Sequence, residues 1–360
     1  MKSAGADEKG YLGMSLDAVM GAVAADPVLG LIVLLCLGAT IVNGATDAPN
    51  AIATVVGTRA MGATPSIIMA AICNFVGLVL ITFASTAVAD TISGMVDFGG
   101  DSHAALIALA AAMVAIIVWG VAAWAFGIPT SQSHSLIAGI TGAAIALQGN
   151  MDGVNLAQWM KVVYGLVVST CLGFGLGWLI ARAIRVFCAN VSRKKANVFF
   201  KWAQIISGAG LAMLHGAQDG QKFLSLTMLA VVLGVAGGTS MGAFPFWMIV
   251  LVSLVMSLGT AVGGRKIIKS VGLDMVKMEQ YQGFSACMSA CVCIGLATFT
   301  GMPVSTTHTK TTAIMGVGAE KSVRNVKWNL AGSMVLTWVL TFPGCGAIAF
   351  LFTKLFLLWA

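Results

Sequence analysis

Long apolar segments alternate with short polar ones from residue 27 to the end of the chain. The apolar segments cover approximately residues 28–58, 64–88, 104–126, 129–147, 157–181, 202–236, 244–264, 280–300, 303–318 and 328–358. About 20 helical residues cross the ~30 Å of hydrocarbon in a bilayer, and most of these segments approach or exceed that length. Membrane strands would instead show ~10-residue segments of alternating polarity. The pattern predicts an all-α polytopic membrane protein with about 10–12 membrane segments.

Composition strengthens this prediction. Of 360 residues, 58% are hydrophobic and 9% are charged, whereas soluble domains carry about 25% charged residues.

Residues 1–27 are expected to form a polar N-terminal tail with a short amphipathic piece. The eight cysteines lie mostly in apolar segments and show no metal-binding spacing, so we expect no cofactor and no transition metal.

The basic residues indicate a topology rather than a nucleic-acid surface. They gather at Arg59 and in the connections 182–201, 265–277 and 321–327, although the net charge is only +7. Placing these connections in the cytoplasm predicts a multi-pass protein of the cell (inner or plasma) membrane, with both termini on the extracytoplasmic side. Loop charge does not decide whether segments 104–126 and 129–147 are two crossings or the arms of a re-entrant hairpin.

Two motifs occur twice. NGATDAPNA at residue 43 is followed by HGAQDGQKF at 215, and GIPTSQSHS at 127 is followed by GMPVSTTHT at 301. Asp47 and Asp219 are 172 residues apart, and His134 and His308 are 174 apart. The predicted topology starts the two copies on opposite sides, which favours two inverted-topology repeats, typical of secondary transporters. We expect repeats at 28–181 and 202–360, joined by a basic cytoplasmic linker at 182–201.

The first repeated motif places a carboxylate deep in an apolar segment. Beside it, Gly44 and Pro49 predict a broken helix that lines a protein or water-filled cavity. An ionised carboxylate there is costly without a cation or donor, and recurrence in the second copy argues against a merely structural hydrogen bond. Oxygen ligands suit a hard cation, so a Na⁺ or H⁺ site is predicted in each copy. Its candidate ligands are Asn43, Thr46, Asp47, Asn50, Thr54, Gln218, Asp219 and Gln221.

The second repeated motif places hydroxyl residues after a proline, a pattern typical of a capped helix start. Such a start presents free N–H groups and a positive dipole to an anion. Two inverted copies would direct two starts at one point, where a tetrahedral oxyanion fits; the alternative is ordinary caps on buried half-helices. The candidate anion-binding residues are Thr130, Ser131, Gln132, Ser133, Ser305, Thr306 and Thr307, with Asp47 and Asp219.

Several nearby residues have open roles. His134 and His308 are either packing residues or orienting or titrating groups. His215 is expected to shape a helix break. Lys222 follows Asp219 by three residues and either neutralises it or attracts the anion. Lys310 is expected to extend to the membrane interface.

The doubled motifs resemble those of the inorganic phosphate transporter (PiT) family, and PVSTTH at 303–308 matches that family as it stands. The resemblance implies inverted repeats with two re-entrant hairpins, a homodimer, and symport of phosphate with Na⁺ or H⁺. It assigns cation binding near phosphate to Asp47, Asn50 and Asp219. It assigns phosphate binding to Ser131, Ser305 and Thr306. Thr46, Gln218, Gln132 and Ser133 depart from the usual motifs, and some family members are described as sulfate permeases.

The function predicted from the sequence is import of inorganic phosphate by symport, with alternating access around a midplane site. Two co-transported cations, one per aspartate, would overcome the membrane potential of ~2.3 kcal/mol per charge per 100 mV. Three alternatives remain: a sulfate symporter, a passive anion channel, and an intramembrane hydrolase that uses the neighbouring Ser and His. We expect a transporter rather than an enzyme.

Overall fold

The computed structural model describes residues 15–126, 130–235, 243–263, 268 and 276–359. The described part is almost entirely helical. Its first half contains α2 (Leu16–Ala25), α3 (Pro27–Thr46), α4 (Pro49–Gly57), α5 (Ala63–Ala84), α6 (Ala87–Ser93), α7 (Ser102–Phe126), α8 (Gln132–Gln148) and α9 (Leu156–Phe187). Its second half contains α10 (Arg193–Val235), α11 (Phe246–Val262), α13 (Gln280–Phe299), α14 (Thr306–Lys321), the 3₁₀ turn η2 (Val323–Asn325) and α15 (Trp328–Leu357).

Six helical segments are long and apolar enough to cross a membrane. They are Pro27–Gly57, Ala63–Ala84, Ser102–Phe126, Leu156–Phe187, Gln280–Phe299 and Trp328–Leu357. Their lateral surfaces carry exposed apolar side chains, such as Leu34, Phe83 and Val339, which a membrane protein directs to lipid. The prediction of a polytopic α-helical membrane protein is confirmed.

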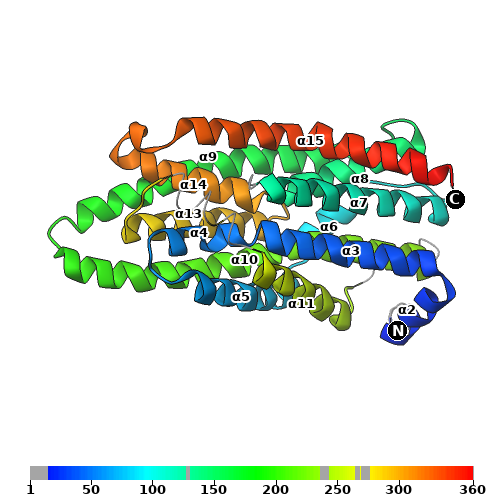
Figure 1. The fold of residues 1–360 in the computed structure, drawn as a ribbon, viewed down its shortest axis with the longest axis horizontal. Coiled ribbons are helices and arrows are strands. Elements are labelled where there is room, and N and C mark those ends of the chain that lie inside the picture. Colours follow the sequence, from blue (N-terminus) through cyan, green and yellow to red (C-terminus); the bar gives the residue numbers. More distant parts are fainter. Residues whose placement is uncertain (1–14, 127–129, 236–242, 264–267, 269–275, 360) are drawn as a thin grey trace, which may run out of the picture.

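Two helical hairpins occupy opposite halves of the long axis (Figure 1). The pair α7–α8 lies toward the end that holds the C-terminus, and α13–α14 lies toward the other end. The starts of α8 and α14 meet between them, where Ser133 Oγ donates to the Val304 carbonyl oxygen at 3.4 Å. Each hairpin therefore delivers one helix start to the middle of the molecule.

The helix packing repeats between the two halves. Gly142 on α8 lies against the backbone of Gly346 on α15, and Gly316 on α14 lies against the backbone of Phe174 on α9. In both places a Cβ atom would overlap a carbonyl oxygen, so only glycine allows the helices to approach this closely. The start of each half is built likewise, since Gly44 lies against α11 and Gly216 lies against α5.

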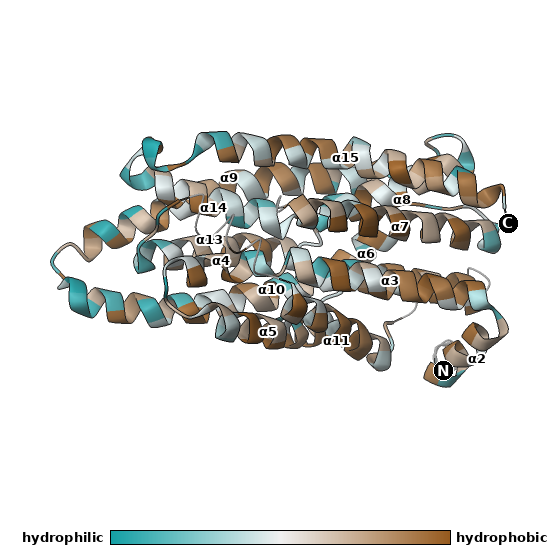
Figure 2. Ribbon diagram, viewed as in Figure 1, coloured by the Kyte–Doolittle hydropathy of each residue, from teal (hydrophilic) through white to brown (hydrophobic). Residues whose placement is uncertain are grey.

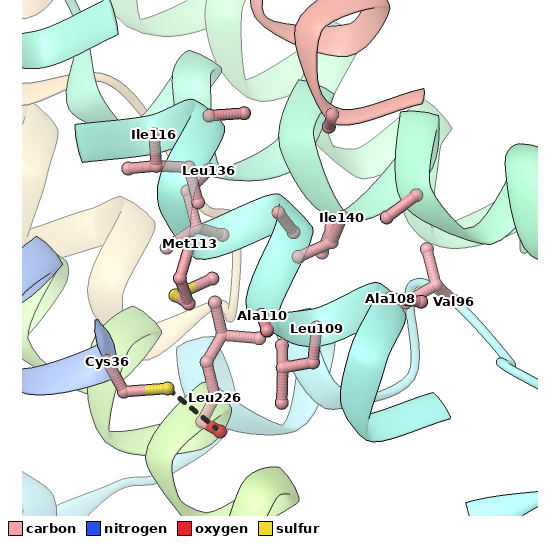
Figure 3. Packing of buried hydrophobic residues seen from close by; sticks show 14 of the residues in the cluster. Cys36, Val96, Ala108, Leu109, Ala110, Met113, Ile116, Leu136, Ile140 and Leu226 are labelled. Carbon is pink, nitrogen blue, oxygen red and sulfur yellow. Dashed lines mark hydrogen bonds between the residues drawn. The ribbon is translucent and has the colours of Figure 1, made fainter. Parts of the chain in front are cut away.

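A buried apolar cluster holds α7 and α8 against the helices that carry the two repeated aspartates (Figure 3). Met113 of α7 packs with Leu136 of α8, and Leu226 of α10 joins the same cluster. Cys36 of α3 lies beside it, with its Sγ 3.9 Å from the Leu226 carbonyl oxygen. The cluster thereby fixes the start of α8 relative to α3 and α10.

The two ends of the molecule differ in polarity (Figure 2). The α9–α10 connection and the α14–α15 connection form a hydrophilic end, whereas apolar residues predominate along α3, α5 and α11. Helix α2 and the C-terminal end of α15 lie together at the opposite end (Figure 1). The basic connections 182–201 and 321–327 thus share one end, whereas most of 265–277 lies outside the described residues. The side of the membrane that this end faces stays a prediction.

The connection between the two expected repeats is largely helical. The segment 182–201 is mostly helical, because α9 continues to Phe187 and α10 already begins at Arg193; its Lys, Arg and Ala residues favour helix outside an apolar segment as well. Helix α15 runs through Pro343 without interruption.

The predicted helix breaks differ from the observed ones. At the first motif α3 ends at Thr46 and α4 begins at Pro49, but Asp47 and Ala48 keep helical dihedral angles, so the chain kinks rather than unwinds. At the second motif α10 passes through Asp219 without a break. The reason lies at the equivalent of Pro49, which is Gln221. Proline removes a backbone N–H and clashes with the preceding turn, whereas glutamine does neither.

The close approach of α14 and α9 generates a stability prediction. Gly316→Ala should lower the melting temperature, because its Cβ would overlap the Phe174 carbonyl oxygen, and overpacking typically costs about 1–3 kcal/mol. Gly332→Ala on α15 is the control, since nothing lies within 4 Å of a Cβ there. Thermal unfolding of both variants in detergent would measure the difference. Equal melting temperatures would contradict the packing described.

Candidate functional site

Four chain segments converge at the middle of the molecule: the α3–α4 kink, the centre of α10, and the starts of α8 and α14. All four segments contribute polar side chains that are shielded from solvent. The exposed fraction is 0% for Asp47, Asp219 and Lys222, and 2% for Asn50. A concentration of polar groups at this depth requires internal partners, since an unpaired buried charge is strongly unfavourable.

The starts of α8 and α14 are capped by serines, as predicted. Ser131 Oγ accepts from the His134 backbone N–H at 3.3 Å, and Ser305 Oγ accepts from the His308 backbone N–H at 3.2 Å. The first N–H groups of a helix have no acceptor within the helix. One of them, on Gln132, donates to Asp47 Oδ2 at 3.2 Å. Both starts direct donors and positive dipole toward the aspartates.

Asp47 lies in the kink and is held by donors from three segments. The Thr307 hydroxyl of α14 and the Gln132 N–H of α8 donate to its two oxygens. Asn50 Nδ2 donates to Asp47 Oδ1 at 3.3 Å and to Thr307 Oγ1 at 2.8 Å. All of these donors are neutral.

Asp219 lies on the uninterrupted α10 and has a charged partner. Lys222 Nζ is 2.8 Å from Asp219 Oδ1, and the Asn43 amide donates to Oδ2 at 3.2 Å. Ser133 Oγ donates to Oδ1 at 3.3 Å, while His215 Nε2 is 3.4 Å from Oδ2. Thr306 Oγ1 lies at the limit of hydrogen bonding, 3.5 Å from Oδ2.

The two carboxylates have mirrored contacts. Each accepts a hydrogen bond from a hydroxyl on the hairpin of the other half of the chain: Thr307 donates to Asp47, and Ser133 donates to Asp219. In each case the residue three positions after the aspartate, Asn50 or Lys222, contacts both the aspartate and that hydroxyl. The site is therefore assembled from both halves, and neither half completes a carboxylate's surroundings alone.

Three residues of the site have unpaired side-chain oxygen atoms. The side-chain carbonyl oxygens of Asn43, Asn50 and Gln132 are buried and have no hydrogen-bond partner within the described part of the chain. Buried acceptors normally find a donor. Of the three, Asn50 bonds Asp47 and Asn43 bonds Asp219 through their amide nitrogens; a carboxylate with a free amide oxygen beside it is the kind of ligand set that a hard cation such as Na⁺ takes.

The structure does not bring every predicted ligand to the carboxylates. Gln218 and Gln221 donate to the Met302 and Ser85 carbonyl oxygens, at 2.8 and 2.7 Å. Thr54 contacts Cys287 Sγ and Lys310 Nζ, at 3.1 and 3.0 Å. The hydroxyls of Ser131 and Ser305 serve as caps, while Thr130 is buried beside them. Direct binding by these residues would need their present bonds to change.

The buried histidines and Lys310 have packing and hydrogen-bonding roles within the protein. The His134 and His308 rings meet edge to face with centroids 4.4 Å apart, and His308 stacks on Trp338 at 3.7 Å. These rings pack where the two hairpins meet. His215 shapes no break, because α10 is continuous; it links Asp219 to α5. Lys310 does not extend to the interface, since it is 1% exposed.

Sequence patterns missed Asn74 of α5, which supports the site from behind. Its Oδ1 lies 3.0 Å from His215 Nδ1, and its Nδ2 donates to Thr260 Oγ1 at 3.1 Å. An asparagine in the middle of a long apolar segment was the available signal. The Val304 carbonyl oxygen was also missed, and it accepts from Lys222 Nζ at 2.8 Å. Every residue has a backbone carbonyl oxygen, so the sequence does not show which of them accepts such a bond.

The site is closely packed in this conformation. A cavity of about 10 Å³ lies beside Asn50, Thr306 and Lys310, which is room for about one water molecule. A tetrahedral oxyanion is larger than that cavity.

Comparisons with known proteins agree with this geometry. Residues 43–196 and 188–349 match the phosphate transporter family. The chain is 36% identical over 323 residues to a "Probable low-affinity inorganic phosphate transporter" of Bacillus subtilis, covering 89% of this chain and 95% of that protein. It is 33% identical over 332 residues to a protein of the same description from Rhizobium meliloti, covering 92% and 97%.

A solved structure described as "The sodium-dependent phosphate transporter" has a similar fold. Its TM-score is 0.83 with 21% sequence identity, and the match covers 93% of this chain and 100% of that one. The family and these relatives are transporters rather than enzymes, so the hydrolase alternative is wrong. With two family matches that together span most of its length, this chain belongs to the phosphate transporter family.

Proposed function

We propose that the protein imports inorganic phosphate by symport with Na⁺ or H⁺, using alternating access around the site between α8, α14 and the two aspartates. The observation that carries the proposal is the mirrored pair of buried carboxylates, each bonded to a helix start from the other half. The names of the curated relatives support phosphate as the substrate. The family resemblance further supports a homodimer in the plasma membrane, with the basic connections in the cytoplasm.

The two halves are proposed to be inverted repeats with re-entrant hairpins. Equivalent contacts recur with nearly constant spacing, as at Gly44 and Gly216 or Ser131 and Ser305. The hairpins α7–α8 and α13–α14 lie in opposite halves of the molecule (Figure 1). Helices α8 and α14, with 17 and 16 residues, are shorter than the about 20 residues of a typical crossing.

Phosphate is proposed to bind between the separated starts of α8 and α14. There it would take the N–H groups and hydroxyls that the aspartates now hold, chiefly those of Gln132, Ser133, Thr306 and Thr307. The aspartates would in turn face the phosphate hydroxyls as acceptors. Sulfate at neutral pH carries no proton to donate, so a nearby carboxylate favours phosphate over sulfate.

The coupling cation is proposed to bind Asp47. The carboxylate lacks a charged partner among the described residues, and the amide oxygen of Asn50, whose nitrogen donates to Asp47, is unpaired. A bound cation would cancel the charge and lower the cost of bringing an anion close. Binding of the two ions is then mutually favourable, which is the basis of symport.

Uptake into proteoliposomes tests the function. We expect labelled phosphate to accumulate when a Na⁺ gradient or a H⁺ gradient is imposed separately, with one of the two giving the larger rate. The reason is that the site holds a buried carboxylate that only a cation neutralises. A phosphate flux that depends on neither the Na⁺ gradient nor the H⁺ gradient would contradict symport and favour a passive channel.

Asp47→Asn should reduce gradient-driven uptake about tenfold or more, corresponding to a loss of at least roughly 1.4 kcal/mol of cation binding. The amide keeps the shape but removes the charge that attracts the cation. Asp90→Asn is the matched control, since Asp90 is an exposed carboxylate on α6. Full gradient-driven uptake by the Asp47 variant would exclude this residue as the cation site.

Competition distinguishes phosphate from sulfate. A large excess of sulfate should leave labelled phosphate uptake nearly unchanged, because sulfate offers no hydroxyl to Asp47 or Asp219. Arsenate, which is tetrahedral and protonated like phosphate, should compete and serves as the positive control. Strong inhibition by sulfate would overturn the assignment of the aspartates as anion-facing acceptors.

A further inference from the structure

The mirrored site contains one difference in charge. The residue three positions after each aspartate is Asn50 in the first half and Lys222 in the second. The two side chains make equivalent contacts, to the aspartate and to the hydroxyl supplied by the opposite hairpin. A neutral amide and an ammonium thus occupy corresponding places.

The surroundings of the Lys222 ammonium resemble those of a bound cation. Its three neighbours are oxygens: Ser133 Oγ at 2.5 Å, Asp219 Oδ1 at 2.8 Å and the Val304 carbonyl oxygen at 2.8 Å. The side chain is 0% exposed. A carboxylate, a hydroxyl and a backbone carbonyl are also the oxygen donors that hard cations take in proteins.

The first half keeps the corresponding place free of positive charge. Asn50 gives one N–H each to Asp47 and Thr307, and its own carbonyl oxygen has no partner among the described residues. Asp47 therefore has no cationic partner among the described residues and a spare amide oxygen beside it, whereas Asp219 has the Lys222 ammonium as its partner.

We infer that Lys222 is a tethered cation that takes the place of a second coupling ion. The transporter then binds one free cation, at Asp47, for each phosphate. This inference rests on the proposed function and replaces the two-cation cycle that the paired aspartates suggested from sequence. With monovalent phosphate, one cation makes the translocated charge zero, so the membrane potential neither drives nor opposes uptake.

The test is to exchange the side chains at positions 50 and 222, one at a time, and to count the cations transported with each phosphate. Lys222→Asn copies the first site into the second half, and Asn50→Lys copies the tethered cation into the first. In proteoliposomes, the ion gradient that just stops net phosphate flux gives the number of coupling ions per phosphate. The dependence of initial rate on cation concentration gives a Hill coefficient that cannot exceed the number of cation sites.

We expect the wild type to couple one cation, with a Hill coefficient of about 1. Lys222→Asn should couple two, with a Hill coefficient that rises toward about 2 and one added positive charge moved per phosphate. The double variant Asp219→Asn/Lys222→Asn removes the whole ion pair and should return to one. Asn50→Lys should carry phosphate without dependence on any cation gradient.

Three results would overturn the inference: a wild type that couples two cations, a Lys222→Asn variant that still couples one, or an Asn50→Lys variant whose flux still needs a cation. If Lys222→Asn proves inactive, the ion count of the wild type and the behaviour of Asn50→Lys still decide the matter. Failure of the proposed function looks different, because the wild type itself would then show no gradient-driven phosphate uptake.

Discussion

The structure depends on the burial of two carboxylates at the centre of a membrane protein. A charged aspartate at the middle of a spanning helix costs about 2.5–3.5 kcal/mol on insertion scales and more by other estimates. Asp47 and Asp219 are fully buried, so hydrogen-bond donors must be placed at the same depth. The two capped helix starts supply them, and the glycine contacts of α8 and α14 allow those helices to lie close enough to do so.

The exchange of donors between halves gives a physical basis for coupling. Thr307 serves Asp47 and Ser133 serves Asp219, so separating α8 from α14 removes a donor from each buried carboxylate. An unpaired buried charge opposes that movement. A cation at Asp47, together with an anion that occupies the vacated donors, would remove the opposition. Opening would then be favoured when both ions are present, and empty or half-loaded states would stay closed.

The sequence predicted the fold class, the first helix kink and both capped helix starts, because each has a strong local cause. Length and hydropathy determine the spans, Pro49 breaks the helix, and Ser131 and Ser305 stand at cap positions. The prediction of a break at Asp219 was wrong because it rested on the similarity of the two motifs. It overlooked Gln221, which stands where the first motif has Pro49. Contacts between distant segments were beyond reach: no local pattern shows that Asn74 supports His215, or that Thr54 faces Lys310.

Symmetry of the scaffold does not impose symmetry of the chemistry. The packing of the two halves agrees down to individual glycines, yet the first half has a kink and a neutral amide where the second has a straight helix and an ammonium. These differences belong together. Lys222 lies three positions after Asp219 on the continuous helix α10, a spacing that places the two side chains on the same face of the helix. At the kink, Asn50 makes the equivalent contact to Asp47, but its amide oxygen stays unpaired among the described residues; under the proposed function, a diffusible cation would take the place that lysine fills in the other half.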